Sequence, residues 1–205
     1  MAERSSEPTG RSTLNELRGM RVAFVVANVG IEDSELAQPW EAVKAAGGSP
    51  QLVAPEPGQA QVVSHRSPTR KVSVDLTTDR LDVQDFDAVV IPGGVANPDR
   101  LRLDRPAVDF VRGMVEAGKP LAVICHGPWM LVEADVVRGR RLTSWPSLRT
   151  DIRNAGGRSV DEQVVVCTDG PNTLITSRKP DDLPAFCRAL TQVFADFAES
   201  HSIRV

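Results

Sequence analysis

The feature that most constrains the fold is a set of short apolar runs, rich in valine, separated by stretches with helical periodicity. The runs at 21–27 (RVAFVVA), 88–91 (AVVI) and 121–124 (LAVI) contain no polar residue except the first arginine. Strands buried on both faces have this composition, whereas a half-solvated strand alternates polar and apolar residues. Strands that alternate with helices predict a doubly wound α/β domain, in which helices cover both faces of a mostly parallel sheet.

The remaining elements follow from periodicity and from helix-capping residues. Further strands are predicted at 51–54, 141–144, 164–166 and 173–176, and helices at 34–46, 105–117, 127–134, 148–154 and 182–198. Ser34 is the expected N-cap of the first helix. The segment 61–74 alternates polar and apolar residues, which predicts an antiparallel excursion at one edge; its His65 fits a solvated loop and a place near a pocket equally well. Arg138–Arg141 is interpreted as a solvated turn.

The chain length of 205 residues suits one domain. We predict a flexible N-terminal extension over 1–19, a single α/β domain over 20–200 and a tail over 201–205. Apolar runs fall well short of the ~20 residues that span a bilayer, and the polar N-terminus lacks the apolar segment of a secretion signal. Neither a membrane nor a nucleic acid is an expected partner, since the net charge of −3 comes from interspersed signs.

Three cysteines, Cys125, Cys167 and Cys187, lie far apart without a C-x-x-C spacing. An odd, scattered set argues against a disulfide framework and a zinc site, and favours a reducing compartment, the cytoplasm. The loop 28–35 has no G-x-G-x-x-G and carries three carboxylates, so dinucleotide binding is not expected. No cofactor and no metal are predicted. Cys167 and Cys187 are interpreted as packing residues.

Cys125 stands where a buried strand turns directly into a helix, in the segment Ile124–Pro128 (ICHGP). A sharp turn of this kind presents a nucleophile, and Gly127 lets the helix approach the strand closely. The N-terminal amides of the next helix favour an anion, which predicts a lowered thiol pKa and a thiolate at neutral pH. A cysteine that merely fills core space would not need this turn, so we interpret Cys125 as reactive.

Few residues can assist this cysteine. The histidines are His65, His126 and His201, and His201 falls in the expected tail. A Cys-His-acid triad with a distal histidine is therefore not available, which leaves His126 as the best candidate. In the loop after the first strand, a protonated Glu32 could donate a hydrogen bond to the thiolate. Asp33 and Glu35 are interpreted as ordinary charges at a helix N-terminus.

Four segments taken together resemble the ThiJ/PfpI superfamily, in particular its PfpI-like branch. They are 31–36 (IEDSEL), 91–94 (IPGG), 122–128 (AVICHGP) and 139–144 (GRRLTS), and the similarity extends over residues 20–197. The resemblance implies a flavodoxin-like three-layer α/β/α sandwich with Cys125 at the nucleophile elbow and Glu32 against its sulfur. It also implies an oxyanion hole from backbone amides near Gly93, Gly94 and Gly127.

The same resemblance implies that an acid from a neighbouring subunit completes His126. That position holds Asp99 here, whereas protease members carry the longer Glu, so a peptidase triad is in doubt. The expected assembly is a homodimer or a hexamer. The implied activity is that of a cysteine-dependent stress-response hydrolase acting on glyoxals or early glycation adducts. An intracellular cysteine peptidase, and a non-catalytic redox-sensing or chaperone-like protein, are the alternatives, and all of them use Cys125.

Overall fold

A computed structural model describes residues 16–65 and 67–201. Its centre is a seven-stranded sheet in the order β11-β12-β8-β7-β1-β3-β6, in which only β11 runs antiparallel to its neighbour. The strands are β1 (Arg21–Val25), β3 (Ser49–Ala54), β6 (Leu76–Thr77), β7 (Ala88–Ile91), β8 (Leu121–Ile124), β11 (Val164–Cys167) and β12 (Leu174–Ser177). The predicted doubly wound α/β fold is confirmed.

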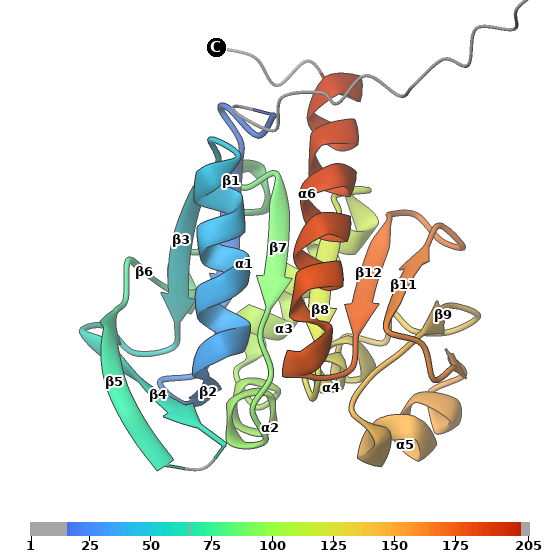
Figure 1. Ribbon diagram of the computed structural model, residues 1–205, viewed down its shortest axis with the longest axis horizontal. Helices are drawn as coiled ribbons and strands as arrows, with labels where there is room; N and C mark the ends of the chain where they lie inside the picture. Colours follow the sequence, from blue (N-terminus) through green and yellow to red (C-terminus); the bar gives the residue numbers. More distant parts are fainter. Residues whose placement is uncertain (1–15, 66, 202–205) are drawn as a thin grey trace, which may run out of the picture.

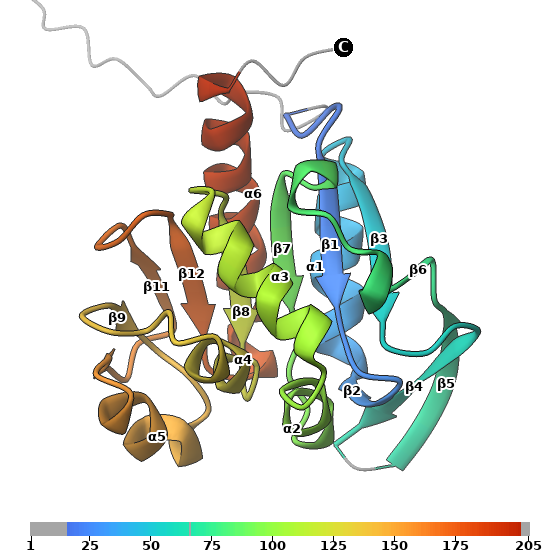
Figure 2. The same ribbon diagram turned by 180° about the vertical axis from the view of Figure 1, so that it is seen from behind.

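Helices cover both faces of this sheet. They are α1 (Asp33–Ala45), α2 (Ala96–Leu101), α3 (Arg105–Glu116), α4 (Pro128–Glu133), α5 (Arg149–Asn154) and α6 (Leu183–Ser200). Figure 1 shows α1 and α6 on one face, and Figure 2 shows α3 on the other. Short 3₁₀ turns lie at Thr78–Arg80, Val83–Asp85, Pro146–Leu148 and Pro180–Asp182. The result is the three-layer sandwich that the resemblance implied.

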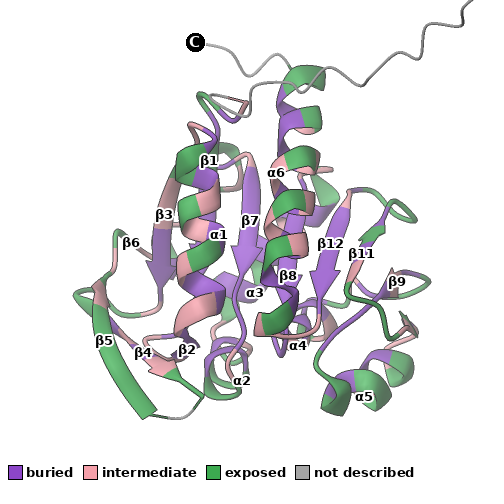
Figure 3. Ribbon diagram, in the orientation of Figure 1, coloured by how far each residue is buried: buried purple, intermediate pink, exposed green. Residues whose placement is uncertain are grey.

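The core is divided by the sheet into two apolar layers. One layer packs α1 and α6 against the sheet through residues such as Leu36, Phe186 and Phe194. The other packs α3 through Val111 and Met114. Figure 3 shows that β7 and β8 are buried along their whole length, as their unbroken apolar sequences predict.

Two small sheets accompany the main one. β2 (Val29–Glu32) pairs in parallel with β4 (Gln59–Ser64), which forms an antiparallel hairpin with β5 (Ser67–Ser73). This hairpin is the predicted excursion, and Figure 1 shows it at the end of the sheet where β7 and β3 terminate. β9 (Arg141–Leu142) and β10 (Arg158–Ser159) form the second small sheet.

Several predicted boundaries are wrong. The domain begins before residue 20, because Leu17 is fully buried and its N–H donates to the carbonyl of Ala46 (2.8 Å). The first helix starts at Asp33, so Ser34 lies inside it and Glu32 takes the N-cap position. His201 is not in a loose tail, since it ends α6 and stacks on Phe197 (3.9 Å between ring centroids). The predicted flexible residues 1–15 and the tail 202–205 lie outside the described residues.

One residue of the predicted solvated turn Arg138–Arg141, the cation Arg140, is buried. Arg140 is 2% exposed, and its guanidinium donates to the carbonyls of Cys167 (3.0 Å) and Asn172 (2.7 Å). Those bonds pin the loop between β11 and β12 to the start of β9. Arg140 therefore stabilises a loop rather than facing water, which charge patterning alone could not reveal.

Candidate active site

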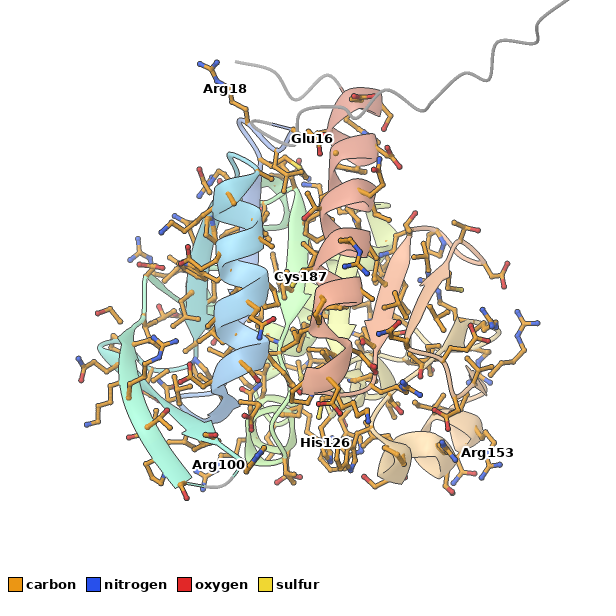
Figure 4. All side chains as sticks on the ribbon, in the orientation of Figure 1. Glu16, Arg18, Arg100, His126, Arg153 and Cys187 are labelled. Carbon is orange, nitrogen blue, oxygen red and sulfur yellow. The ribbon has the colours of Figure 1, made fainter. Side chains whose placement is uncertain are left out.

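A cavity of about 650 Å³ opens at the carboxyl ends of β7, β8 and β12. This is the end of a doubly wound sheet where ligands bind. In Figure 4, His126 lies at this end of the molecule, far from the end at which Glu16 and Arg18 lie. The cavity is lined by Glu32, Glu35, His65, Gly94, Val95, Cys125, His126, Trp145, Ser147, Lys179, Pro180 and Asp181. The structure thus brings together the loops that the sequence placed at strand ends.

Cys125 occupies a strained turn between β8 and α4. Its φ angle is +62°, in the left-handed region that non-glycine residues rarely adopt, and it is 6% exposed. Such strain costs of order 1–3 kcal/mol and concentrates at functional sites. A Cβ at Gly127 would lie 2.7 Å from Val123 Cγ1, so only glycine lets the helix begin this close to the strand. The predicted sharp turn at Cys125 and the predicted close approach at Gly127 are confirmed, whereas a part for Gly127 in an oxyanion hole stays a prediction.

The loop after β7 also requires its two glycines. A Cβ at Gly93 would lie 2.5 Å from both Cys125 Cβ and Glu35 Oε2. Gly94 has φ +83°, and a Cβ there would lie 2.1 Å from the carbonyl oxygen of Gly30. These contacts let the loop backbone lie directly against the cysteine. The N–H groups of Gly94 and His126 act on Cys125 Sγ and lower the pKa of the thiol, which is the influence that oxyanion-hole donors would have.

The acid beside the thiol is Glu35, not Glu32. Glu35 is fully buried, its Oε2 accepts the N–H of Gly93 (2.9 Å), and its carboxyl is close enough to the Cys125 thiol to raise the pKa of that thiol. The predictions that Glu32 lies against the sulfur and that Glu35 is a surface charge are both wrong. The physical reason is the helical period: Glu35 precedes Pro39 by one turn and Val43 by two, so it shares their inward face.

Burial keeps Glu35 protonated at neutral pH. Loss of solvation is the main cause that raises the pKa of Glu35 from 4.5 to about 8. Cys125 and the N–H of Gly93 oppose this rise, and the neighbouring Glu32 adds to it. Its Oε1 is buried and has no direct hydrogen bond to a side-chain or backbone atom. Oε1 is therefore the oxygen left to carry the proton that this raised pKa implies.

The predicted lowering of the thiol pKa is wrong for this single chain. Burial is the largest influence and raises the pKa of Cys125, Glu35 raises it further, and the amides of Gly94 and His126 oppose the rise. Two buried acids in contact resist double ionisation, and their proton losses belong to the pair. Cys125 and Glu35 together hence carry no more than one negative charge near neutral pH.

His126 is a neutral base next to the sulfur. Its Nδ1 lies 3.2 Å from Cys125 Sγ, and its Nε2 lies 3.5 Å from Ser147 Oγ. Burial lowers the pKa of His126 to about 4. The ring is held between Trp129 (5.3 Å between centroids) and Trp145 (5.7 Å, nearly parallel). Trp129 packs against the His126 ring without lining the cavity. Trp145 and Ser147 do line it, and no sequence pattern pointed to either residue.

Glu32 and His65 form the opposite wall of the cavity. Glu32 is 8% exposed, and its Oε2 accepts the N–H of His65 (3.0 Å) at the tip of the β4–β5 hairpin. The open question about His65 is answered, because it lines the cavity while remaining exposed. Lys179, which the sequence analysis did not single out, contributes a cation to the rim and pairs with Asp181 (3.0 Å).

Asp99 is not among the lining residues. It lies exposed on α2, next to the loop that carries Gly93 and Gly94. Its predicted contact with His126 across an interface stays a prediction.

Within residues 16–65 and 67–201, no group of three or more His, Cys, Asp or Glu side chains is placed to bind a metal ion. Over the same residues, none of the helices combines the length and apolarity that a membrane crossing demands.

Comparison with known proteins agrees with the fold. The sequence matches the DJ-1/PfpI family over residues 20–193, and the chain belongs to that family. The resemblance noted in the sequence is therefore confirmed.

Particular relatives are similar over most of their length. General stress protein 18 of Bacillus subtilis is 42% identical over 170 residues, which cover 83% of this chain and 95% of the relative. Protein/nucleic acid deglycase 2 of Escherichia coli is 41% identical over 157 residues, covering 77% and 88%. Among solved structures, a two-domain protein of Anabaena variabilis with DJ-1/ThiJ/PfpI-like and ferritin-like domains matches with a TM-score of 0.77 and 36% identity. That match covers 84% of this chain but only 47% of the longer protein.

Proposed function

We propose that this protein is a cysteine-dependent stress-response hydrolase that converts glyoxals, or early adducts of glyoxals with amines, into hydroxy acids. The observation that carries this proposal is the Cys125 elbow, where one sulfur contacts a base, an acid and two amide donors. The deglycase name of the Escherichia coli relative supports the substrate class. A reducing cytoplasm is the proposed location, in line with the three unpaired cysteines Cys125, Cys167 and Cys187.

The first step requires a proton to leave the thiol. His126 is neutral at pH 7, so its Nδ1 accepts the Cys125 proton as the sulfur attacks the aldehyde carbon. The new alkoxide takes that proton back and becomes a hemithioacetal. The amides of Gly94 and His126 stabilise negative charge as it moves between sulfur and oxygen.

The next steps move one proton and add one water molecule. A carboxylate or imidazole removes the proton from the former aldehyde carbon, and its return to the adjacent carbon gives a thioester of the hydroxy acid. Glu35 is the acid next to the sulfur, and Glu32 faces the same cavity. Water then cleaves the thioester, which releases the hydroxy acid and restores the Cys125 thiol.

We also propose that a second copy of the chain completes the site. A base with a pKa of about 4 is weak at pH 7, and a carboxylate near Nε2 would raise that pKa. Asp99 is exposed on α2 for such a contact, and the exposed Val95 (50%) and Leu103 (85%) lie on either side of that helix. A homodimer or hexamer through this face would bury both apolar side chains.

The decisive experiment measures conversion of methylglyoxal to lactate by wild type, Cys125→Ser and Cys187→Ser. Cys187 is partly exposed on α6 and serves as the matched control. We expect wild type and Cys187→Ser to turn over equally and Cys125→Ser to be inactive. Equal turnover in all three, or in none, would overturn the proposal.

Parallel assays distinguish the alternatives. Cleavage of fluorogenic peptides without glyoxal turnover would favour a peptidase. Oxidation of Cys125 by mild peroxide, in a protein inactive on both substrates, would favour a redox sensor.

A further inference from the structure

Asn97 is a fully buried polar side chain in the first turn of α2, outside the cavity lining. Its Oδ1 accepts the N–H of Ala27 (2.7 Å), at the end of β1. This bond fixes which end of the amide faces which neighbour, because only the oxygen can accept from an N–H. Its Nδ2 consequently faces the loop after β7.

Nδ2 donates to two consecutive carbonyls, those of Pro92 (2.9 Å) and Gly93 (3.1 Å). A trans peptide is planar, and its C=O and N–H point in opposite directions. The peptide that begins with the Pro92 carbonyl ends in the Gly93 N–H, which donates to Glu35 Oε2 (2.9 Å). The next peptide begins with the Gly93 carbonyl and ends in the Gly94 N–H, which lowers the pKa of the Cys125 thiol.

We infer that Asn97 is a positioning residue, whose single amide group orients and polarises the two peptide units that hold Glu35 and Cys125. It touches neither substrate nor the reacting atoms. A hydrogen bond to a peptide carbonyl strengthens the hydrogen bond that the same peptide donates. Asn97 therefore acts on the acid and the nucleophile at once, through the backbone of Gly93 and Gly94.

The loop has little other support. The Gly93 carbonyl also accepts the N–H of Glu32, but at 3.4 Å. Glycines at 93 and 94 are required by the close contacts with Cys125 and Gly30, and they leave the loop without side chains to anchor it. Asn97 supplies the short bonds that the glycines cannot.

The test compares Asn97→Ala with Asn172→Ala by the pH dependence of Cys125 alkylation with iodoacetamide, resolved by mass spectrometry. Asn172 is a matched control, since it is also buried and donates from Nδ2 to a backbone carbonyl, that of Lys119 (2.7 Å), beside Arg140. Without Asn97, the N–H groups of Gly93 and Gly94 are less well oriented and stabilise the Glu35 and Cys125 anions less. We therefore expect the midpoint pH of Cys125 alkylation in Asn97→Ala to rise by about half a pH unit or more. The midpoint of Asn172→Ala should match wild type.

Equal midpoints in folded wild type, Asn97→Ala and Asn172→Ala would overturn the inference. This readout needs no substrate, so it stands even if the proposed function fails. If glyoxal turnover is found, kcat of Asn97→Ala should fall about tenfold or more while KM changes little.

A measurement on the wild type covers the case in which Asn97→Ala does not fold. The side-chain amide NMR signals of Asn97 should shift with pH together with the Cys125–Glu35 pair, and those of Asn172 should not. An Asn97 signal that is unchanged across this titration would contradict the inference.

Discussion

Replacing Glu35 by Gln should remove a pH-dependent loss of stability. The carboxyl binds its proton more tightly in the folded chain, where its pKa is about 8, than at its ordinary value of 4.5. The resulting stability is therefore fully present below pH 4.5 and is lost as the pH rises through 8. Complete ionisation of Glu35 corresponds to about 5 kcal/mol, at about 1.4 kcal/mol per pKa unit.

Between pH 6 and pH 9 the linkage relation attributes a loss of about 2.5 kcal/mol to Glu35. The assay is urea denaturation at fixed protein concentration and with reductant, for wild type, Glu35→Gln and Glu41→Gln. Glu41 is exposed on the same helix and should behave like wild type. Glu35→Gln should lose about 2.5 kcal/mol less than the other two over this range. An equal loss in all three proteins would refute the reasoning.

Three further predictions concern other parts of the site. The pKa of His126 is about 4 in the folded chain, against an ordinary 6.5, so wild type should lose stability as the pH falls from 6.5 towards 4. His126→Gln should lose less stability over this range in acid denaturation curves, and parallel curves for the two proteins would contradict this. Gly93→Ala should lower the unfolding free energy by at least about 2 kcal/mol in urea, because its Cβ would lie 2.5 Å from Cys125 Cβ. Gly139→Ala meets no neighbouring atom and should cost only about 1 kcal/mol, for its left-handed φ of +74°; similar losses would count against the clash. Asp99→Asn should reduce glyoxal turnover about tenfold if it completes His126, and full activity in the assembled protein would remove Asp99 from the site.

The fold and the nucleophile could be predicted because both depend on local sequence. Unbroken apolar runs such as Ala88–Ile91 can only be strands buried on both faces, and Cys125 lies between such a run and a helix start. The turn between β8 and α4 had to be sharp because no loop separates them, and Gly127 indicated that the helix approaches the strand closely there.

The acid was misassigned because its position depends on the phase of a helix. Glu35 precedes Pro39 by one helical turn and Val43 by two, which places it with them on the buried face of α1. That spacing was visible in the sequence, where a charged residue occupies the apolar stripe of the helix.

The direction of the thiol pKa could not be predicted from the turn alone. The amides of Gly94 and His126 lower the pKa of Cys125, but burial and the proximity of Glu35 outweigh them, and both of these effects arise from tertiary packing. Asn97 gave no sequence signal, because its partners Ala27 and Pro92 are brought together only by the order of the strands.

The most direct test of the central claim is the rate of Cys125 alkylation as a function of pH in the wild-type protein. A buried pair in which Glu35 and Cys125 both keep their protons near neutral pH predicts slow reaction at pH 6 and a midpoint near pH 8 or above. Cys187 is an internal reference, because burial raises its pKa to about 11. Alkylation of Cys125 that has already reached its maximum at pH 6 would show a resting thiolate and contradict the account.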